Sequence, residues 1–353
     1  MEGGLSLSKV ELKVAKEEDA ELWDRLVESS PHGTIFHTWK WLKIVEKHTD
    51  SRLYPIIGFK GTEPVALIPL FYQKRFVLRM IFSPPPHVAI PFLGLLMVNY
   101  DQLKQNKKES NLIEFQKELD HFLSDEIKPN YVNLVHPPDF IDVRPFVWSG
   151  YNATPTFNYV FDLSAGKTKL WENLKKHTRK NIKTASENLK ILKGSREDLR
   201  IIYHQLEERY QEQDRKLKTR LEFLEDIYDC FKECMHIVMA EMDGEVVGGL
   251  VNLVYKDRMY SWIGNAKTRI KGIYPNDLLI WESMRYGCTN GYKVFYEIGA
   301  NTPRLVRYKA NFNPELVINF GIEKSNIPLR SFAKKIYHTY FRNYKFFDFF
   351  EVL

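Results

Sequence analysis

The fold of this chain is decided by one stretch, His236-Ile-Val-Met-Ala-Glu-Met-Asp243-Gly244-Glu-Val-Val-Gly-Gly-Leu-Val-Asn-Leu-Val-Tyr255. Two apolar runs flank Asp243-Gly244, a pair that tolerates the positive φ angles of a tight hairpin turn. Lys256-Asp257 turns the chain again, into a third apolar run that ends near Gly264. The stretch therefore predicts an antiparallel meander of three strands.

A helix and a further strand are predicted directly after the meander. Pro275 suits the first turn of a helix, and Asp277 suits its positive end. Asn290-Gly291 is a typical stop signal, which gives a helix of residues 275–289. The run 292–298 then has the pattern of a strand. Such a crossover makes the strands on either side of the helix parallel neighbours.

The loop before this helix is a candidate anion site. Arg269 and Lys271 supply positive charge, and Gly272 allows the backbone to approach a ligand closely. The free N–H groups of the helix N-terminus favour the same kind of group. The pattern is short, and an ordinary surface loop explains it equally well.

Length and composition limit the class of protein. The chain has 353 residues, more than one hydrophobic core usually serves, so two domains are expected. Its net charge of +6 favours an anionic partner, although we expect no DNA binding. The three cysteines and ten histidines show no metal-ligand spacing, so no metal and no tightly bound cofactor are expected. No P-loop, Gly-x-Ser-x-Gly or dinucleotide fingerprint supports a kinase, hydrolase or dehydrogenase.

The expected compartment is the cytoplasm. The N-terminus lacks a basic segment followed by a long apolar one, so no signal peptide is predicted. The sequence has no run of about 18 apolar residues, so no transmembrane helix is predicted. A disulfide framework is not indicated by the cysteines, which fits a reducing environment.

The order of elements occurs twice along the chain. Residues 1–155 are predicted to form helices, three meander strands, a helix and a strand, and the order returns after Tyr151. We therefore expect an α+β fold of two lobes, residues 1–155 and 156–353, each a mixed, mostly antiparallel sheet flanked by helices. A basic, aromatic C-terminal helix is expected near Leu329–Phe347. It is interpreted as a docked terminal helix, with peripheral contact to a membrane surface as the alternative.

A long basic helix is predicted from Lys167 to Lys190. Its apolar residues form one stripe, and Arg179, Lys180 and Lys183 lie off that stripe. The basic side chains are either a solvated face or a wall of positive charge for phosphate groups. Few acids are interspersed, and both interpretations stay open.

Several polar residues follow the final predicted strand, where sheets often collect ligands. Glu297, at the strand end, is the best-placed general base, although a salt bridge to a nearby arginine is slightly favoured. Asn301 is a candidate hydrogen-bonding group in the same place. Arg307, Tyr308 and Lys309 supply basic and phenolic groups, with a solvated turn as the alternative.

These pieces resemble the FemABX-type acyltransferases and their GNAT-like relatives. The resemblance is carried by Leu170–Ala185, by Asp243-Gly-Glu-Val-Val-Gly248, by Tyr274–Gly291, and by Glu297-Ile-Gly299 leading to Arg307-Tyr-Lys309-Ala-Asn-Phe312. It implies two tandem GNAT-like lobes, and Arg179 and Lys309 among the substrate-phosphate or active-site contacts. The GNAT pyrophosphate loop, Arg/Gln-x-x-Gly-x-Gly/Ala, is matched by Arg269-x-x-Gly272-x-Tyr274 except at its last position.

The resemblance implies an N-acyltransferase that uses acyl-CoA or aminoacyl-tRNA as co-substrate. The acceptor would be an amine of a cell-envelope precursor, a peptide or a small molecule. Catalytic roles are expected for Glu297, Tyr308 and Lys309. Contacts to the anionic donor are expected from Arg179, Lys180, Lys183, Arg269, Lys271, Gly272, Asn301 and Arg307. The alternative is a non-catalytic binding protein for RNA or for an anionic glycolipid or nucleotide-sugar.

Overall fold

The computed structural model describes residues 9–214, 216–266 and 269–325. In this part of the chain two compact units are separated: residues 9–155 with 318–325, and residues 156–317. From the sequence, residues 318–325 were expected in the second lobe. They join the first unit because Gly321–Ser325 pair with a strand of that unit. The terminal helix expected near Leu329–Phe347 lies outside the described residues.

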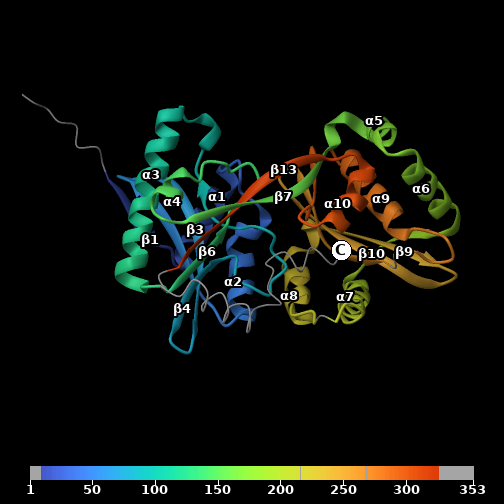
Figure 1. Ribbon diagram of the computed structural model, residues 1–353, viewed down its shortest axis with the longest axis horizontal. Helices are drawn as coiled ribbons and strands as arrows, with labels where there is room; N and C mark the ends of the chain where they lie inside the picture. The colour runs from blue at the N-terminus through green and yellow to red at the C-terminus, as the bar shows by residue number, and fades with distance from the viewer. Residues whose placement is uncertain (1–8, 215, 267–268, 326–353) are drawn as a thin grey trace, which may run out of the picture. The chain divides into compact units, whose positions relative to one another are not determined.

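The first unit is built on a mixed, mostly antiparallel sheet (Figure 1). Its strands lie in the order β1 (Val10–Val14), β2 (Arg52–Lys60), β3 (Glu63–Arg75), β4 (Leu78–Ser83), β6 (Tyr131–Val135) and β13 (Glu315–Ser325), and the short β5 (Leu96–Met97) pairs with β3. Among the described strands of this unit, only β4 and β6 are parallel neighbours. The predicted meander of β2, β3 and β4 is therefore confirmed.

Among its described residues, the first unit has four α-helices: α1 (Ala20–Ser29), α2 (Trp39–His48), α3 (Gln105–Phe122) and α4 (Arg144–Trp148). Leu112, Phe115 and Leu119 of α3 are buried against the sheet, one helical turn apart. Short 3-10 turns are η1 (Glu17–Asp19), η2 (Ile35–His37) and η3 (Tyr100–Gln102), and a π-helical turn is η4 (Leu123–Ile127).

The second unit also has a mixed, mostly antiparallel sheet. Its strands lie in the order β7 (Asn152–Asp162), β12 (Val294–Glu297), β11 (Arg258–Ala266), β10 (Glu245–Tyr255), β9 (Met235–Met242) and β8 (Lys190–Lys193). The hairpin prediction is confirmed, because Asp243 and Gly244 have φ angles of 54° and 87°. The predicted parallel neighbours are β11 and β12. Sequence patterns did not predict β8 or the antiparallel pairing of β12 with β7.

The helices of the second unit are α5 (Gly166–Asn173), α6 (Lys176–Asn188), α7 (Arg196–Gln211), α8 (Leu221–Phe231), α9 (Pro275–Thr289) and α10 (Pro303–Lys309), with the short turns η5 (Leu163–Ala165), η6 (Lys232–Cys234) and η7 (Ala310–Phe312). Helix α9 has the predicted bounds. Helix α10 was not predicted, although Thr302 and Pro303 carry a start signal: the Thr302 hydroxyl accepts from the N–H of Leu305, and Pro303 is the first helical residue.

The prediction of a single basic helix from Lys167 to Lys190 is wrong, because the helix is interrupted between α5 and α6. Leu174 and Lys175 have extended backbones, with ψ angles of 144° and 148°. The N–H of Lys175 donates to the Asn311 carbonyl at 3.0 Å, a tertiary bond that no local pattern reveals. The guanidinium of Arg179 then donates to the Glu172 carbonyl at 2.8 Å, near the end of α5. These two hydrogen bonds, from Lys175 and from Arg179, satisfy backbone carbonyl groups and so stabilise the interruption between α5 and α6.

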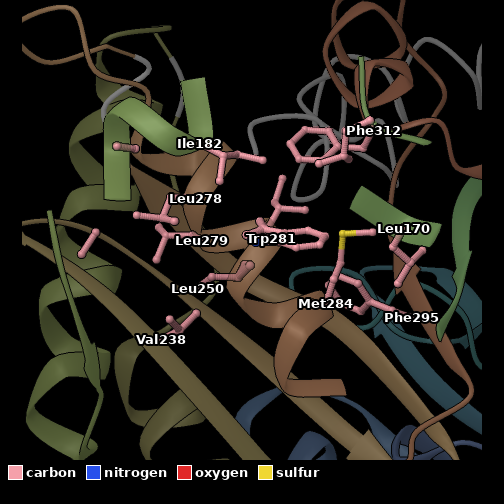
Figure 2. Packing of buried hydrophobic residues seen from close by; sticks show 14 of the residues in the cluster. Leu170, Ile182, Val238, Leu250, Leu278, Leu279, Trp281, Met284, Phe295 and Phe312 are labelled. Carbon is pink, nitrogen blue, oxygen red and sulfur yellow. The ribbon is translucent and has the colours of Figure 1, made fainter. Parts of the chain in front are cut away.

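Helix α9 forms the centre of the second core. Figure 2 shows its residues Leu278 and Leu279 between Ile182 of α6 and Leu250 of β10. Helix α7 covers the opposite face of the sheet, where Ile202 contacts the position of Gly249. Among the described residues, no helix is both long and apolar enough to cross a membrane.

Candidate functional site

The parallel strands β11 and β12 part at their carboxyl ends. They pair only from Arg258–Val294 to Ser261–Glu297, where β12 ends. Strand β11 continues to Ala266, and the register between β10 and β11 shifts next to Asn252. Parallel strands that separate in this way are a common location for ligand sites in sheets with crossover helices. Glu297, the candidate general base of the sequence analysis, therefore lies where the two strands separate.

Glu297 forms a buried ion pair with Lys309 at this point. The Nζ of Lys309 is 3.0 Å from Oε1 of Glu297, and the two side chains are 2% and 6% exposed. The same Nζ donates to the carbonyl of Ile298, the residue that follows β12. Among the described residues, no group hydrogen-bonds the buried Oε2 of Glu297. One carboxylate oxygen is thus held by a cation, and the other has an unused lone pair.

This outcome settles part of the sequence interpretation. A salt bridge of Glu297 was favoured, but to a nearby arginine, whereas its observed partner is Lys309. A solvated turn was the alternative for Lys309, which is instead the buried last residue of α10. Burial of both charges requires mutual compensation, because a lone ion in a protein interior is costly.

A second buried carboxylate, Asp277, lies in the first turn of α9. It accepts hydrogen bonds from Asn181 Nδ2 at 2.9 Å and from the Tyr308 hydroxyl at 3.1 Å. Tyr308 precedes Lys309 on α10, so contacts run continuously from α6 through Asp277 to the ion pair. Helix N-termini favour acidic side chains, which explains why a carboxylate is tolerated there. The sequence identified Asp277 as a helix-start residue and missed its two partners.

The network changes the acidity of its members. Burial raises the pKa of Asp277, and the hydrogen bonds from Asn181 and Tyr308 offset part of that rise. The pKa of Tyr308 is raised well above its usual value, mainly by burial and secondly by the negative charge of the nearby Asp277 carboxylate. Tyr308 is therefore held as a protonated donor. The pKa of Arg209 is lowered, mainly by burial and secondly by the positive charge of Arg304. The charge of Arg209 in turn offsets part of the rise in the pKa of Tyr308.

Replacement of Asp277 by Asn is expected to remove a pH dependence of stability. Because its folded-state pKa is raised, the folded protein binds more protons than the unfolded chain between about pH 3.9 and the folded-state pKa. The free energy of unfolding of the wild type should fall as pH rises through this window. In Asp277→Asn that contribution should vanish, as urea unfolding across the window would measure. An unchanged slope would show that Asp277 titrates normally.

A row of polar side chains crosses the sheet on the face covered by α9. Register places His236, Asn252, Ser261, Glu297 and Tyr159 directly opposite one another on successive strands β9, β10, β11, β12 and β7. Opposite residues share one face of a sheet. Within the described chain, His236 Nε2, Asn252 Oδ1 and Glu297 Oε2 are buried without a hydrogen-bond partner. Such atoms are costly, which favours a functional reason for the row.

Sequence reasoning missed this row except for Glu297. The residues are spread over about 140 positions, and each alone resembles an ordinary strand residue. The signal that was available is a polar residue inside each apolar strand. Only the register brings these signals together, and register across five strands is a long-range property.

The basic residues of α6 have different environments. Lys180 and Lys183 are exposed, and no described residue forms a salt bridge with either. Lys176, one turn earlier, is also exposed, so the three lie at positions i, i+4 and i+7 on one face. Arg179 is instead half-buried and its guanidinium binds the carbonyls of Trp171 and Glu172.

The loop before α9 is occupied by internal contacts. The guanidinium of Arg269 lies 5.6 Å from the Tyr274 ring centroid, and Lys271 Nζ is 2.9 Å from Asp243. Gly272 has a φ angle of +87°, which suits a residue without a Cβ. A Cβ there would meet nothing closer than Arg269, at 3.8 Å.

The last two predicted residues are held by backbone groups. Asn301 accepts from the N–H of Phe157 at 2.8 Å and donates to its carbonyl at 3.1 Å, which ties the chain after β12 to β7. Arg307 is exposed on α10 and donates to the Pro303 carbonyl. Glu297, Tyr308 and Lys309 are thus brought together, whereas Asn301 and Arg307 make structural contacts.

Comparison with known proteins identifies a domain within this chain and proteins of similar fold. Residues 169–310 match the sequence profile of the acetyltransferase (GNAT) domain. No curated protein matches the chain at a significant level. Among solved structures, FemX is similar over 92% of this chain and 99% of its own, with 14% identity and a TM-score of 0.67.

Two further structures have the same fold. L-PGS from Bacillus licheniformis is similar over 92% of this chain and 98% of its own, with 13% identity and a TM-score of 0.54. A tandem GNAT protein from the clavulanic acid biosynthesis pathway is similar over 91% of this chain and 99% of its own chain, with 9% identity and a TM-score of 0.52. Two tandem GNAT-like lobes are therefore the correct fold class. Residues 169–310 thus carry an acetyltransferase (GNAT) domain, in a chain whose fold is that of the tandem GNAT-like proteins.

Proposed function

We propose that this protein is an N-acyltransferase that moves an acyl or aminoacyl group from an activated donor to an amine. The observation that carries the proposal is the buried Glu297–Lys309 pair at the point where β11 and β12 part. The pair combines an acceptor for a proton with a fixed positive charge. Both are needed when a neutral amine attacks an ester or thioester.

The chemistry assigns one role to each partner. The amine nitrogen forms a bond to the donor carbonyl carbon, and Lys309 stabilises the negative charge that develops on the carbonyl oxygen. Glu297 accepts the proton of the attacking nitrogen through its unused oxygen Oε2. The bond from carbon to the ester or thioester leaving group then breaks, and the leaving group takes up a proton. Tyr308 is a poor base, because it already donates to Asp277.

The donor is proposed to contact the exposed lysines of α6. Lys180 and Lys183 lack acidic partners among the described residues, and α6 is joined to the ion pair through Asn181, Asp277 and Tyr308. The N-terminus of α9 is a weaker place for a pyrophosphate, since the Asp277 carboxylate already occupies its first turn. These features favour aminoacyl-tRNA over acyl-CoA as the donor. The acceptor is proposed to be an amine of a cell-envelope precursor, a peptide or a small molecule.

The proposal is tested by product formation from each donor. The full chain is incubated with acetyl-CoA or with a mixture of aminoacyl-tRNAs, together with a panel of amines that includes amino-terminated peptides. Mass spectrometry should detect a new amide with the aminoacyl-tRNA donors. Binding of tRNA without any amide product, and with a steep salt dependence, would replace the proposal by the non-catalytic binding protein.

The lysines of α6 give a separate prediction. Lys180→Gln with Lys183→Gln should weaken tRNA binding and lower the slope of log affinity against log salt by about 1.4, since single strands release about 0.7 counterions per contact. Lys117→Gln, which removes an exposed lysine of α3 in the first unit, is the matched control and should leave the slope unchanged. Filter binding over a range of salt concentrations measures both. Equal slopes in all three proteins would place the donor elsewhere.

A further inference from the structure

Two apolar side chains at the tip of the β3–β4 hairpin are unusually exposed. Phe76 is 94% exposed and Val77 is 84% exposed, the highest values among the exposed large hydrophobic residues of the described chain. The hairpin projects from the rest of the first unit in Figure 1. Single exposed apolar residues are common on proteins, but an adjacent pair at a projecting tip is not needed for folding.

The turn itself contains a residue in an unfavourable conformation. Phe76 has a φ angle of 53°, in the left-handed region where glycine and asparagine are preferred. A bulky side chain there is strained relative to glycine, because its Cβ crowds the following carbonyl oxygen. A glycine at position 76 would close the same hairpin at lower cost. A local rule that is broken without a structural benefit indicates a functional site.

The strands next to the tip carry opposed positive charges. Lys74 and Arg79 are direct cross-strand partners, so they share one face of the hairpin. Like charges in such pairs destabilise a sheet. Neither side chain has a salt bridge to any described residue. Arg75, on the other face, is 2.6 Å from Asp50, with both side chains at least half exposed.

We infer that this hairpin tip inserts into the interfacial region of an anionic lipid bilayer. Phe76 and Val77 would enter the boundary between headgroups and acyl chains, and Lys74 and Arg79 would contact lipid phosphates. The combination of an apolar tip and a cationic collar is typical of interfacial anchors. Each cation near an anionic surface contributes to binding, and the surface removes the repulsion between the pair. A tip of two exposed apolar residues is too small for a stable protein interface, which takes about 20–30 residues of all kinds per side.

The inference does not depend on the proposed acyl transfer, because no residue of the second unit is involved. It is tested by sedimentation of the full chain with vesicles of phosphatidylcholine alone or mixed with phosphatidylglycerol. Phe76→Asn with Val77→Ser should bind the mixed vesicles at least about 100-fold more weakly, because the burial of two apolar side chains is lost. Asparagine tolerates the positive φ angle, so the thermal unfolding temperature should not fall.

Two controls separate the anchor from other causes. Ile141→Ser removes another exposed apolar side chain of the first unit, 69% exposed, and should bind the vesicles as the wild type does. Lys74→Gln with Arg79→Gln should bind the mixed vesicles about 30-fold more weakly at low salt, at about 1 kcal/mol per cation, and lose little on phosphatidylcholine. Absence of wild-type binding, or equal binding by the tip variant, would overturn the inference. A lipid-independent change in solution mass caused by the tip variant would also overturn it, in favour of a protein contact.

Discussion

Replacement of Glu297 by Gln is expected to reduce acyl transfer by about 10²–10⁴-fold, the usual contribution of a positioned general base. The amide keeps the shape of the side chain and can still accept a hydrogen bond from Lys309. It cannot take a proton from the attacking amine, so the loss should appear in the chemical step. Single-turnover kinetics with saturating donor would measure it, because binding of the donor is then complete.

The stability of this variant must be measured alongside its rate. Lys309 loses its charge partner in Glu297→Gln, and removal of one partner from a buried pair costs about 3–5 kcal/mol. Assays are therefore run at a temperature where circular dichroism shows the variant to be folded. Glu245→Gln, an exposed carboxylate on β10, is the matched control and should retain full rate and stability. Retention of the wild-type rate by folded Glu297→Gln would exclude this carboxylate as the base.

Removal of the cation is expected to have the largest effect on folding. Lys309→Met leaves the Glu297 carboxylate buried without compensation, so the free energy of unfolding should fall by about 3–5 kcal/mol. Urea unfolding followed by fluorescence measures this change. Acyl transfer should be lost as well, but the single variant does not show whether the fold or the chemistry is responsible.

The double variant separates these two causes. Buried ion pairs that are replaced by apolar residues of similar volume often lose no stability. Lys309→Met combined with Glu297→Leu should therefore recover most of the free energy of unfolding that Lys309→Met loses. The unpaired Ile298 carbonyl is the expected remaining cost, at about 1–3 kcal/mol. A double variant that is less stable than either single variant would mean that the pair does not interact as described.

Local patterns predicted the parts of this fold that local chemistry controls. The turn at Asp243-Gly244 needs positive φ angles, and the ends of α9 need Pro275 and Asn290-Gly291, so adjacent residues were sufficient. The break between α5 and α6 was not predictable in this way. It depends on the Lys175–Asn311 bond, whose partners are 136 residues apart.

The candidate site shows the same division. Glu297 was found because a carboxylate stands at the end of an apolar run. Its partner Lys309 was singled out too, but their contact requires α10, which brings the lysine back to the end of β12. The surroundings of Arg179 were not predictable, because basic character alone does not reveal that its guanidinium donates to carbonyl oxygens of α5. Burial and register, which connect distant residues, decided these cases.

The proposed role of the Glu297–Lys309 pair is acyl transfer to an amine. Its most direct test is the single-turnover yield of amide by the wild type and by the stable double variant Lys309→Met/Glu297→Leu, with aminoacyl-tRNA as donor. We predict amide from the wild type and none above the uncatalysed background from the double variant, although both are folded. Amide formation by the folded double variant at the wild-type rate would contradict the claim.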